Sequence, residues 1–205
     1  MDRIYTGFKK IDAETIIQKG ELVVIAGRPA TGKTTLVSTI IKNTLDRQKT
    51  LFFTMQFKNS KAIENLVTFA KDKGENFLIV PNLLGLEDMI LKVGERKLNC
   101  GLDVVVIDNF CDFINYLNVT ETFLISKLKK MAKMLGVAVI ITDYITRNGN
   151  NYPSYTDVMH REFLKQADVI MSLYPYSRNE CDEYSVDCDT ICLTVDKDVR
   201  TYDYC

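Results

Sequence analysis

The chain lacks several features that would place it in a specialised class of protein. It has no tryptophan, a single histidine and a net charge of −1 over 205 residues. Without an excess of positive charge, any nucleic-acid binding must come from a local basic patch. No apolar run approaches the roughly 20 residues that span a bilayer, and the opening MDRIYTGFKK lacks the apolar core of a signal peptide. We therefore expect a cytosolic (cytoplasmic) protein.

The six cysteines contain no Cys-x-x-Cys pair, which argues against a structural zinc site. Cys100 and Cys111 flank an apolar run, so we expect buried thiols there. The remaining four lie near the C-terminus and fit reduced thiols of a cytosolic chain.

Short apolar runs alternate with helical patterns along the chain. The apolar runs predict seven strands, at residues 21–27, 50–55, 77–80, 103–108, 137–142, 167–174 and 190–195. Apolar residues at helical spacing predict helices over residues 33–47, 60–70, 86–98 and 120–135. This alternation predicts one α/β domain over residues 1–205, a mainly parallel sheet flanked by helices on both faces. The last strands are candidates for antiparallel pairing at an edge.

A phosphate-binding motif follows the first predicted strand. Residues 27–35 read GRPATGKTT and match G-x-x-x-x-G-K-[ST] between an apolar strand and a helix. Glycines allow backbone N–H groups to curl around phosphate oxygens, and the helix N-terminus points its free N–H groups at the same anion. The expected nucleotide-binding residues are Gly27, Arg28, Pro29, Ala30, Thr31, Gly32, Lys33, Thr34 and Thr35.

A candidate metal ligand lies at the end of another strand. Asp108 closes the run VVVID, where a carboxylate can hold Mg²⁺ directly or through a water. The hydroxyl of Thr34 is the second expected ligand, while Lys33 is expected to contact the β- and γ-phosphates.

With these motifs in place, the sequence resembles the ATPase domain of DnaB-like replicative helicases, within the RecA-like group of P-loop NTPases. The matching segments are TGFKKID, GELVVIAGRPATGKTT, GLDVVVIDNF, ISKLKKMAKMLGVAVIIT and FLKQADVIMSLY. The resemblance implies a RecA-like fold, ATP held between neighbouring subunits of a homo-oligomeric ring such as a hexamer, and DNA held by loops in the central pore. The family's N-terminal helical domain, which contacts primase, is expected to be absent from this chain.

The hydrolytic positions depart from the family pattern. Where the family has a catalytic glutamate, the stretch FTMQF has Gln56, which can orient a water but cannot accept its proton. Where the family has a polar sensor, the stretch TDY has Asp143. Near the C-terminus, Lys197 and Arg200 occupy the region of the family's trans-acting basic pair at altered spacing, or are solvated charges at a strand end.

Two loops would face DNA by the same resemblance. Residues 110–120 contain no Lys or Arg, and residues 144–161 contain Arg147 and Arg161. Tyr116, Tyr152 and Tyr155 are either base-stacking or packing residues. We expect His160 to be a surface or interface residue.

Two functions therefore compete. The first is an ATP-driven, DnaB-like motor that translocates on single-stranded DNA, with impaired hydrolysis. The second is a catalytically weak nucleotide-binding paralogue that regulates or assembles other replication or repair proteins.

Overall fold

The computed structural model describes residues 3–56, 60–71, 74–81, 84–146, 155–175, 186–188 and 191–198. Eight of the described strands form one sheet in the order β5-β4-β6-β7-β3-β8-β10-β9. The bounds are β3 Leu22–Gly27, β4 Thr50–Thr54, β5 Phe77–Val80, β6 Val104–Asp108, β7 Ala138–Tyr144, β8 Val169–Pro175, β9 Val186–Cys188 and β10 Ile191–Asp198. The six strands from β5 to β8 are mutually parallel, and β10 and β9 add to the β8 edge in antiparallel pairing. The predicted fold class is confirmed.

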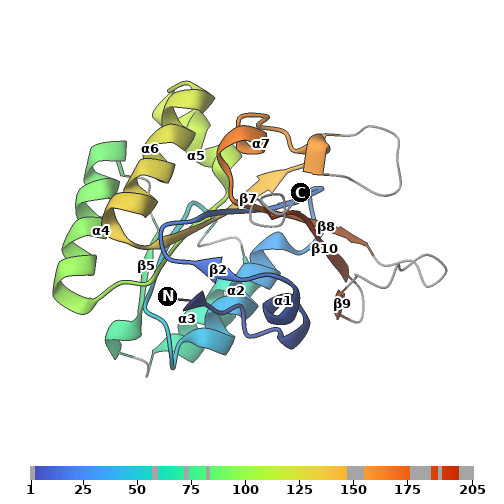
Figure 1. The fold of residues 1–205 in the computed structure, drawn as a ribbon. Coiled ribbons are helices and arrows are strands. Elements are labelled where there is room, and N and C mark those ends of the chain that lie inside the picture. Colours follow the sequence, from blue (N-terminus) through green and yellow to red (C-terminus); the bar gives the residue numbers. More distant parts are fainter. Residues whose placement is uncertain are drawn as a thin grey trace.

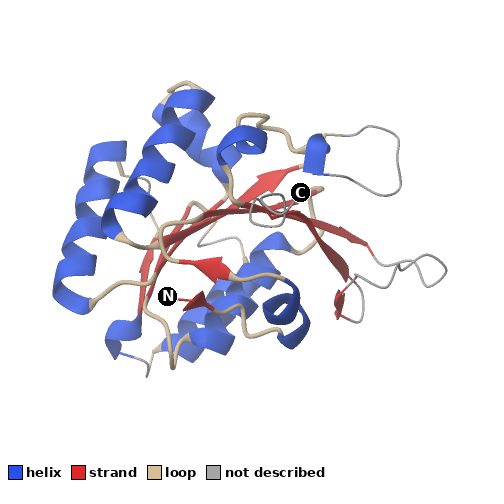
Figure 2. Ribbon diagram, in the orientation of Figure 1, coloured by secondary structure: helices blue, strands red, loops and turns tan. Residues whose placement is uncertain are grey.

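Helices cover both faces of this sheet, which accounts for the continuous apolar strands (Figure 1). One face carries α1 Lys9–Glu14, α2 Lys33–Thr44 and α3 Lys61–Ala70; the other carries α4 Leu86–Cys100, α5 Phe110–Leu117, α6 Glu121–Leu135 and α7 Phe163–Gln166. Figure 2 shows the strands of the eight-stranded sheet as one twisted layer between these two layers of helices. Strand residues alternate between the two cores: Val23 and Ile25 pack towards α2, whereas Leu22 and Val24 pack towards α6.

Parallel pairing brings the carboxyl ends of β3, β4, β6 and β7 together at the same end of the sheet. In the register, Gly27 of β3 pairs with Tyr144 of β7, and Thr54 of β4 pairs with Asp108 of β6. The loop after β3 and the side chains that end β6 and β7 therefore meet in one place, which is where open α/β sheets bind ligands.

The segment expected to be a loop at residues 110–120 is instead mainly helix α5. Asn109 caps it, because its side-chain oxygen accepts a hydrogen bond from the Asp112 N–H at 2.9 Å. Phe110 and Phe113 lie one turn apart on its inner face and are fully buried. The sequence signal for helix α5 was an Asn at the N-cap followed by apolar residues at helical spacing.

Other differences from the sequence expectations are smaller. A short antiparallel pair, β1 Arg3–Ile4 with β2 Ile17–Gln18, packs beside α1 and was not predicted. Strand β9, Val186–Cys188, also lies outside the seven strands predicted from the sequence. Cys100 and Cys111 are free thiols but only half-buried, because they lie on helices α4 and α5 and not in the sheet.

None of the helices in the described part of the chain combines the length and the apolar character needed to cross a membrane.

The packing of α6 onto the sheet gives a stability prediction. Leu128 on α6 has no exposed surface, whereas Leu98 on α4 is 87% exposed. We expect Leu128→Ala to lower the free energy of unfolding by about 2–5 kcal/mol, through lost burial and a residual cavity. The matched control Leu98→Ala should stay within about 0.5 kcal/mol of the wild type. Urea denaturation followed by circular dichroism measures both, and equal losses would contradict this packing.

Candidate functional site

The loop between β3 and α2 forms a tight curl that depends on its two glycines. Gly32, the N-cap of α2, has φ +89°, a left-handed conformation that favours glycine. A Cβ on Gly27 would lie 2.7 Å from Thr31 Oγ1 and 2.9 Å from the Leu173 carbonyl oxygen. The Thr31 hydroxyl closes the curl by donating to the Arg28 carbonyl at 2.8 Å. The loop thus presents its backbone and the start of α2 to one small space, as an anion cradle does.

Lys33 places its ammonium group inside this curl. It is 7% exposed and donates hydrogen bonds of 2.8 Å to the carbonyl oxygens of Gly27 and Arg28. The Tyr144 ring lies 4.5 Å from its Nζ. Burial lowers the pKa of Lys33 to about 8, although the charges of Asp108 and Asp143 oppose the shift. A buried ammonium held by carbonyl oxygens favours an incoming anion, which would compensate its charge.

Asp108 lies at the end of β6, directly across from the start of α2. It is 3% exposed; its Oδ2 accepts from the Thr34 hydroxyl at 2.9 Å and its Oδ1 accepts from the Thr142 hydroxyl at 2.5 Å. Burial raises its pKa, against the hydrogen bonds from both threonines and the charge of Lys33. One carboxylate and one hydroxyl in contact form an oxygen donor pair that fits Mg²⁺.

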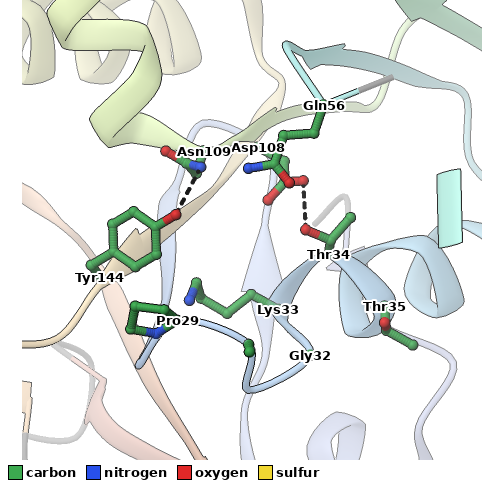
Figure 3. Close-up of a pocket in the computed structure, with 10 residues that line it drawn as sticks. Pro29, Gly32, Lys33, Thr34, Thr35, Gln56, Asp108, Asn109 and Tyr144 are labelled. Carbon is green, nitrogen blue, oxygen red and sulfur yellow. Dashed lines mark hydrogen bonds between the residues drawn. The ribbon is translucent and has the colours of Figure 1, made fainter. Parts of the chain in front are cut away.

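A cavity of about 300 Å³ joins these groups (Figure 3). The described residues that line it are Pro29, Ala30, Gly32, Lys33, Thr34, Thr35, Gln56, Asp108, Asn109 and Tyr144. Most of the predicted phosphate-motif residues and the two predicted metal ligands therefore meet in one space. Gly27, Arg28 and Thr31 support the loop without lining the cavity.

Two lining residues were missed by sequence reasoning. Asn109 follows the last residue of β6, Tyr144 is the last residue of β7, and the Asn109 amide donates to the Tyr144 hydroxyl at 3.3 Å (Figure 3). Burial, then the charge of Asp112, raises the pKa of Tyr144, so its hydroxyl stays protonated. The sequence places both residues near strand ends, but their contact depends on how β6 and β7 are aligned in space.

Gln56 lines the cavity on the side opposite the loop. Its backbone N–H donates to Thr54 Oγ1 at 3.1 Å, and its side-chain amide nitrogen lies 3.5 Å from Asp112 Oδ2. The predicted position of Gln56 beside the candidate nucleotide is therefore compatible with this geometry, whereas its role in hydrolysis stays a prediction.

Asp143 lies outside this cavity. Strand alternation turns it to the face opposite Thr142 and Tyr144, where it is completely buried and its Oδ1 pairs with His160 Nδ1 at 2.8 Å. His160 is correspondingly not a surface residue: its side chain is 12% exposed. Its ring packs edge-on against Phe110, with ring centroids 4.8 Å apart.

The remaining predicted residues lie apart from the cavity or outside the described residues. Arg161 is exposed in the turn before α7, and Tyr116 is 54% exposed on α5. Lys197 lies on β10, of which only the backbone is described. Tyr155 begins a short 3₁₀ helix, Tyr155–Asp157, and its own side chain is not among those described. Arg147, Tyr152 and Arg200 lie outside the described residues.

Comparison with known proteins shows which family and which proteins the chain is similar to. Residues 3–73 match the family described as DnaB-like helicase C terminal domain. "Probable plasmid replicative DNA helicase" of Chlamydia psittaci is 26% identical over 215 residues, which cover 85% of this chain and 47% of that protein. "Probable replicative DNA helicase" of Guillardia theta is 27% identical over 146 residues, which cover 69% of this chain and 23% of that protein. The chain thus spans about half the length of the first relative and less of the second.

Two solved structures share the fold. One is an ATPase domain, which superposes with a TM-score of 0.71 at 20% identity, covering 95% of this chain and 83% of that one. The other is a DnaB-like replicative helicase, solved in a study of its interactions with primase, which gives 0.70 at 19% identity, covering 95% and 56%. The resemblance to a DnaB-like helicase C-terminal domain is confirmed. The match to the family covers β3, the phosphate-motif loop, α2 and β4, which build most of the cavity.

The Asp143–His160 pair gives a pH prediction. Burial lowers the pKa of His160, but the hydrogen bond and charge of Asp143, with the charge of Glu121, outweigh it and raise the pKa above its ordinary value. Because the pKa of His160 is higher in the folded than in the unfolded protein, the Asp143–His160 pair contributes its full stabilisation of the folded state below about pH 6.5. This contribution is lost as the pH rises through the folded pKa.

We therefore expect the free energy of unfolding of the wild type to exceed that of His160→Asn most at about pH 5.5, and the gap to shrink as pH rises. Urea titrations between about pH 5.5 and 7.5 measure this gap, and the titration of Lys33, whose pKa is about 8, is common to both proteins and cancels in the difference. A gap that widens with pH would contradict the pairing.

Proposed function

We propose that this DnaB-like domain binds ATP with Mg²⁺ and hydrolyses it slowly, as part of a motor that moves along single-stranded DNA. The observation that carries the proposal is the meeting of Lys33, Thr34 and Asp108 in one cavity at the carboxyl ends of β3 and β6. A phosphate chain in this cavity would take hydrogen bonds from the loop N–H groups, with Lys33 at the β- and γ-phosphates. When bound between Thr34 and Asp108, Mg²⁺ supplies charge neutralisation of the phosphate oxygens.

The scarcity of acidic side chains around the cavity supports slow hydrolysis. Asp108 is the single carboxylate among its described lining residues, and it is the proposed metal ligand. No second carboxylate in that set remains to take a proton from water, because Gln56 occupies the far wall. Loss of a general base typically lowers a rate by about 10²–10⁴, while glutamine can still orient water in some phosphate-loop enzymes.

Assembly into a homo-oligomeric ring is a further part of the proposal. In such a ring Lys197 and Arg200 would approach the nucleotide of the neighbouring subunit, and Arg147 and Arg161 would contact the phosphates of single-stranded DNA in the pore. This placement rests on the resemblance to DnaB-like helicases.

The second candidate function is a nucleotide-bound regulatory or assembly module. The same observation favours it, since a cavity equipped to bind phosphate but poor in acids retains its ligand. DNA-stimulated phosphate release distinguishes the motor from the module: the module binds ATP and assembles without turnover that rises on adding single-stranded DNA.

Nucleotide binding is the first test. We expect Lys33→Ala to weaken binding of a fluorescent ATP analogue with Mg²⁺ by about 10- to 150-fold, the loss of a charge-assisted hydrogen bond of about 1.5–3 kcal/mol. Lys42→Ala is the matched control, because Lys42 lies in the last turn of the same helix, beside Phe69 and away from the cavity. Equal affinities of wild type and Lys33→Ala would sink the assignment of the cavity.

Turnover is the second test. We expect steady-state phosphate release well below the ordinary enzyme rate of about 10 s⁻¹, and we expect Asp108→Asn to raise the Mg²⁺ concentration that turnover requires. Wild-type turnover near that ordinary rate would contradict slow hydrolysis while leaving nucleotide binding intact.

A further inference from the structure

Gln56 forms the wall between the nucleotide cavity and a second, more open hollow. This hollow, of about 600 Å³, is lined by Met55, Gln56, Asp112, Asn115 and Tyr116. Asp112 lies in the first turn of α5, behind Gln56 as seen from the phosphate-motif loop. A carboxylate is thus in contact with the neutral residue that occupies the expected place of a catalytic acid.

Asp112 is held in this place by two reciprocal bonds with the N-cap residue of its own helix. Its backbone N–H donates to Asn109 Oδ1 at 2.9 Å, and its Oδ2 accepts from Asn109 Nδ2 at 2.9 Å. The same Oδ2 faces Gln56 Nε2 at 3.5 Å, the long end of the hydrogen-bond range. Bonds of this kind at active sites commonly shorten once substrate is bound.

The carboxylate decides which way the Gln56 amide points. An ionised carboxylate only accepts hydrogen bonds, so Gln56 must turn its NH₂ group towards Asp112. The carbonyl oxygen Oε1 is then directed away from Asp112. A carbonyl oxygen accepts a hydrogen bond from water, whereas an NH₂ group would present only donors to it.

We propose that Asp112 is a positioning residue for hydrolysis, which locks Gln56 so that its Oε1 receives a hydrogen bond from the attacking water. The proposal rests on the proposed function, because it concerns the water that attacks the γ-phosphate. In that step the water oxygen bonds to the γ-phosphorus and the bond to the β–γ bridging oxygen breaks. The electron pair leaves with the diphosphate, and a water proton passes to a γ-phosphoryl oxygen and departs with inorganic phosphate.

The simplest test is Asp112→Ala, which removes the acceptor that holds the Gln56 NH₂ group but keeps the helix cap, because the bond to Asn109 Oδ1 uses the backbone N–H of residue 112. We expect kcat to fall by about 10- to 100-fold, with KM and the affinity for a fluorescent ATP analogue unchanged, because Asp112 does not line the nucleotide cavity. Asn115→Ala, one turn along α5 in the same hollow, is the matched control and should keep the wild-type kcat. A wild-type kcat for Asp112→Ala overturns the proposal.

If Asp112→Ala fails to fold, Asp112→Leu serves, because its apolar side chain also offers Gln56 no acceptor and the cap bond to Asn109 uses the backbone N–H of residue 112. We expect the same fall in kcat with unchanged nucleotide affinity. Thermal unfolding of each variant confirms that it is folded.

A second experiment tests the contact between Gln56 and Asp112 directly. In Gln56→Glu a new carboxylate would face Asp112, and two carboxylates sharing a site retain a proton between them, so the glutamate is not a free base. We expect Gln56→Glu alone to leave kcat unraised, and Gln56→Glu with Asp112→Asn to raise kcat at least about tenfold above it. Equal gains from Gln56→Glu in both backgrounds overturn the proposal.

Nucleotide affinity is measured for every variant, so that failure of this inference can be told apart from failure of the proposed function. Absence of binding in the wild type removes the proposed function and this inference with it. Tight binding and slow turnover in the wild type, with the same kcat in Asp112→Ala, overturns the inference alone.

Discussion

The site depends on one buried arrangement, the contact between the carboxylate that ends β6 and the hydroxyl in the first turn of α2. Asp108 and Thr34 are 74 residues apart in sequence and 2.9 Å apart in space. The parallel sheet produces this contact, since β7 lies between β3 and β6 and pairs with both in one register. A shift of one residue in either pairing would turn Asp108 to the other face of the sheet, and the loop after β3 would lose its partner.

The sequence predicts the parts of the site that are local. The strand, the glycine-rich curl and the helix start lie within residues 22–44, so spacing alone specifies them. Asp108 was predictable because an acid after a buried strand lies at the edge where the other parallel strands end. Asn109 and Tyr144 were not, because their contact depends on how β6 and β7 are aligned in space. Asp112 was hidden for a second reason: interpreting its segment as a loop removed the helix that fixes it.

The alternation of side chains along β7 explains why the sequence alone could not tell which residue at the end of this strand faces the cavity. Residues 142, 143 and 144 all follow the same apolar run, and resemblance to a family pattern selects Asp143 among them. Side chains alternate along a strand, however, so the bond between Thr142 and Asp108 commits Tyr144 to the cavity and Asp143 to the opposite face. There Asp143 fixes His160 against Phe110 and Phe163, and thereby connects the end of β7 to the segment before α7. A buried carboxylate has such a partner because leaving it unpaired is costly.

The two acids on either side of α5's N-terminus differ in the kind of donor that holds them. Asp108 is held by two hydroxyl groups, Thr34 and Thr142. A hydroxyl can rotate and offer its lone pairs to a cation, so Thr34 can exchange the carboxylate for Mg²⁺ without moving its backbone. Asp112 is held by amide nitrogens of Asn109 and Gln56. An amide cannot act as donor and acceptor through the same end, so this contact fixes an orientation and does not exchange. The first arrangement suits a residue that must receive a metal ion, and the second suits one that must hold a neighbour still.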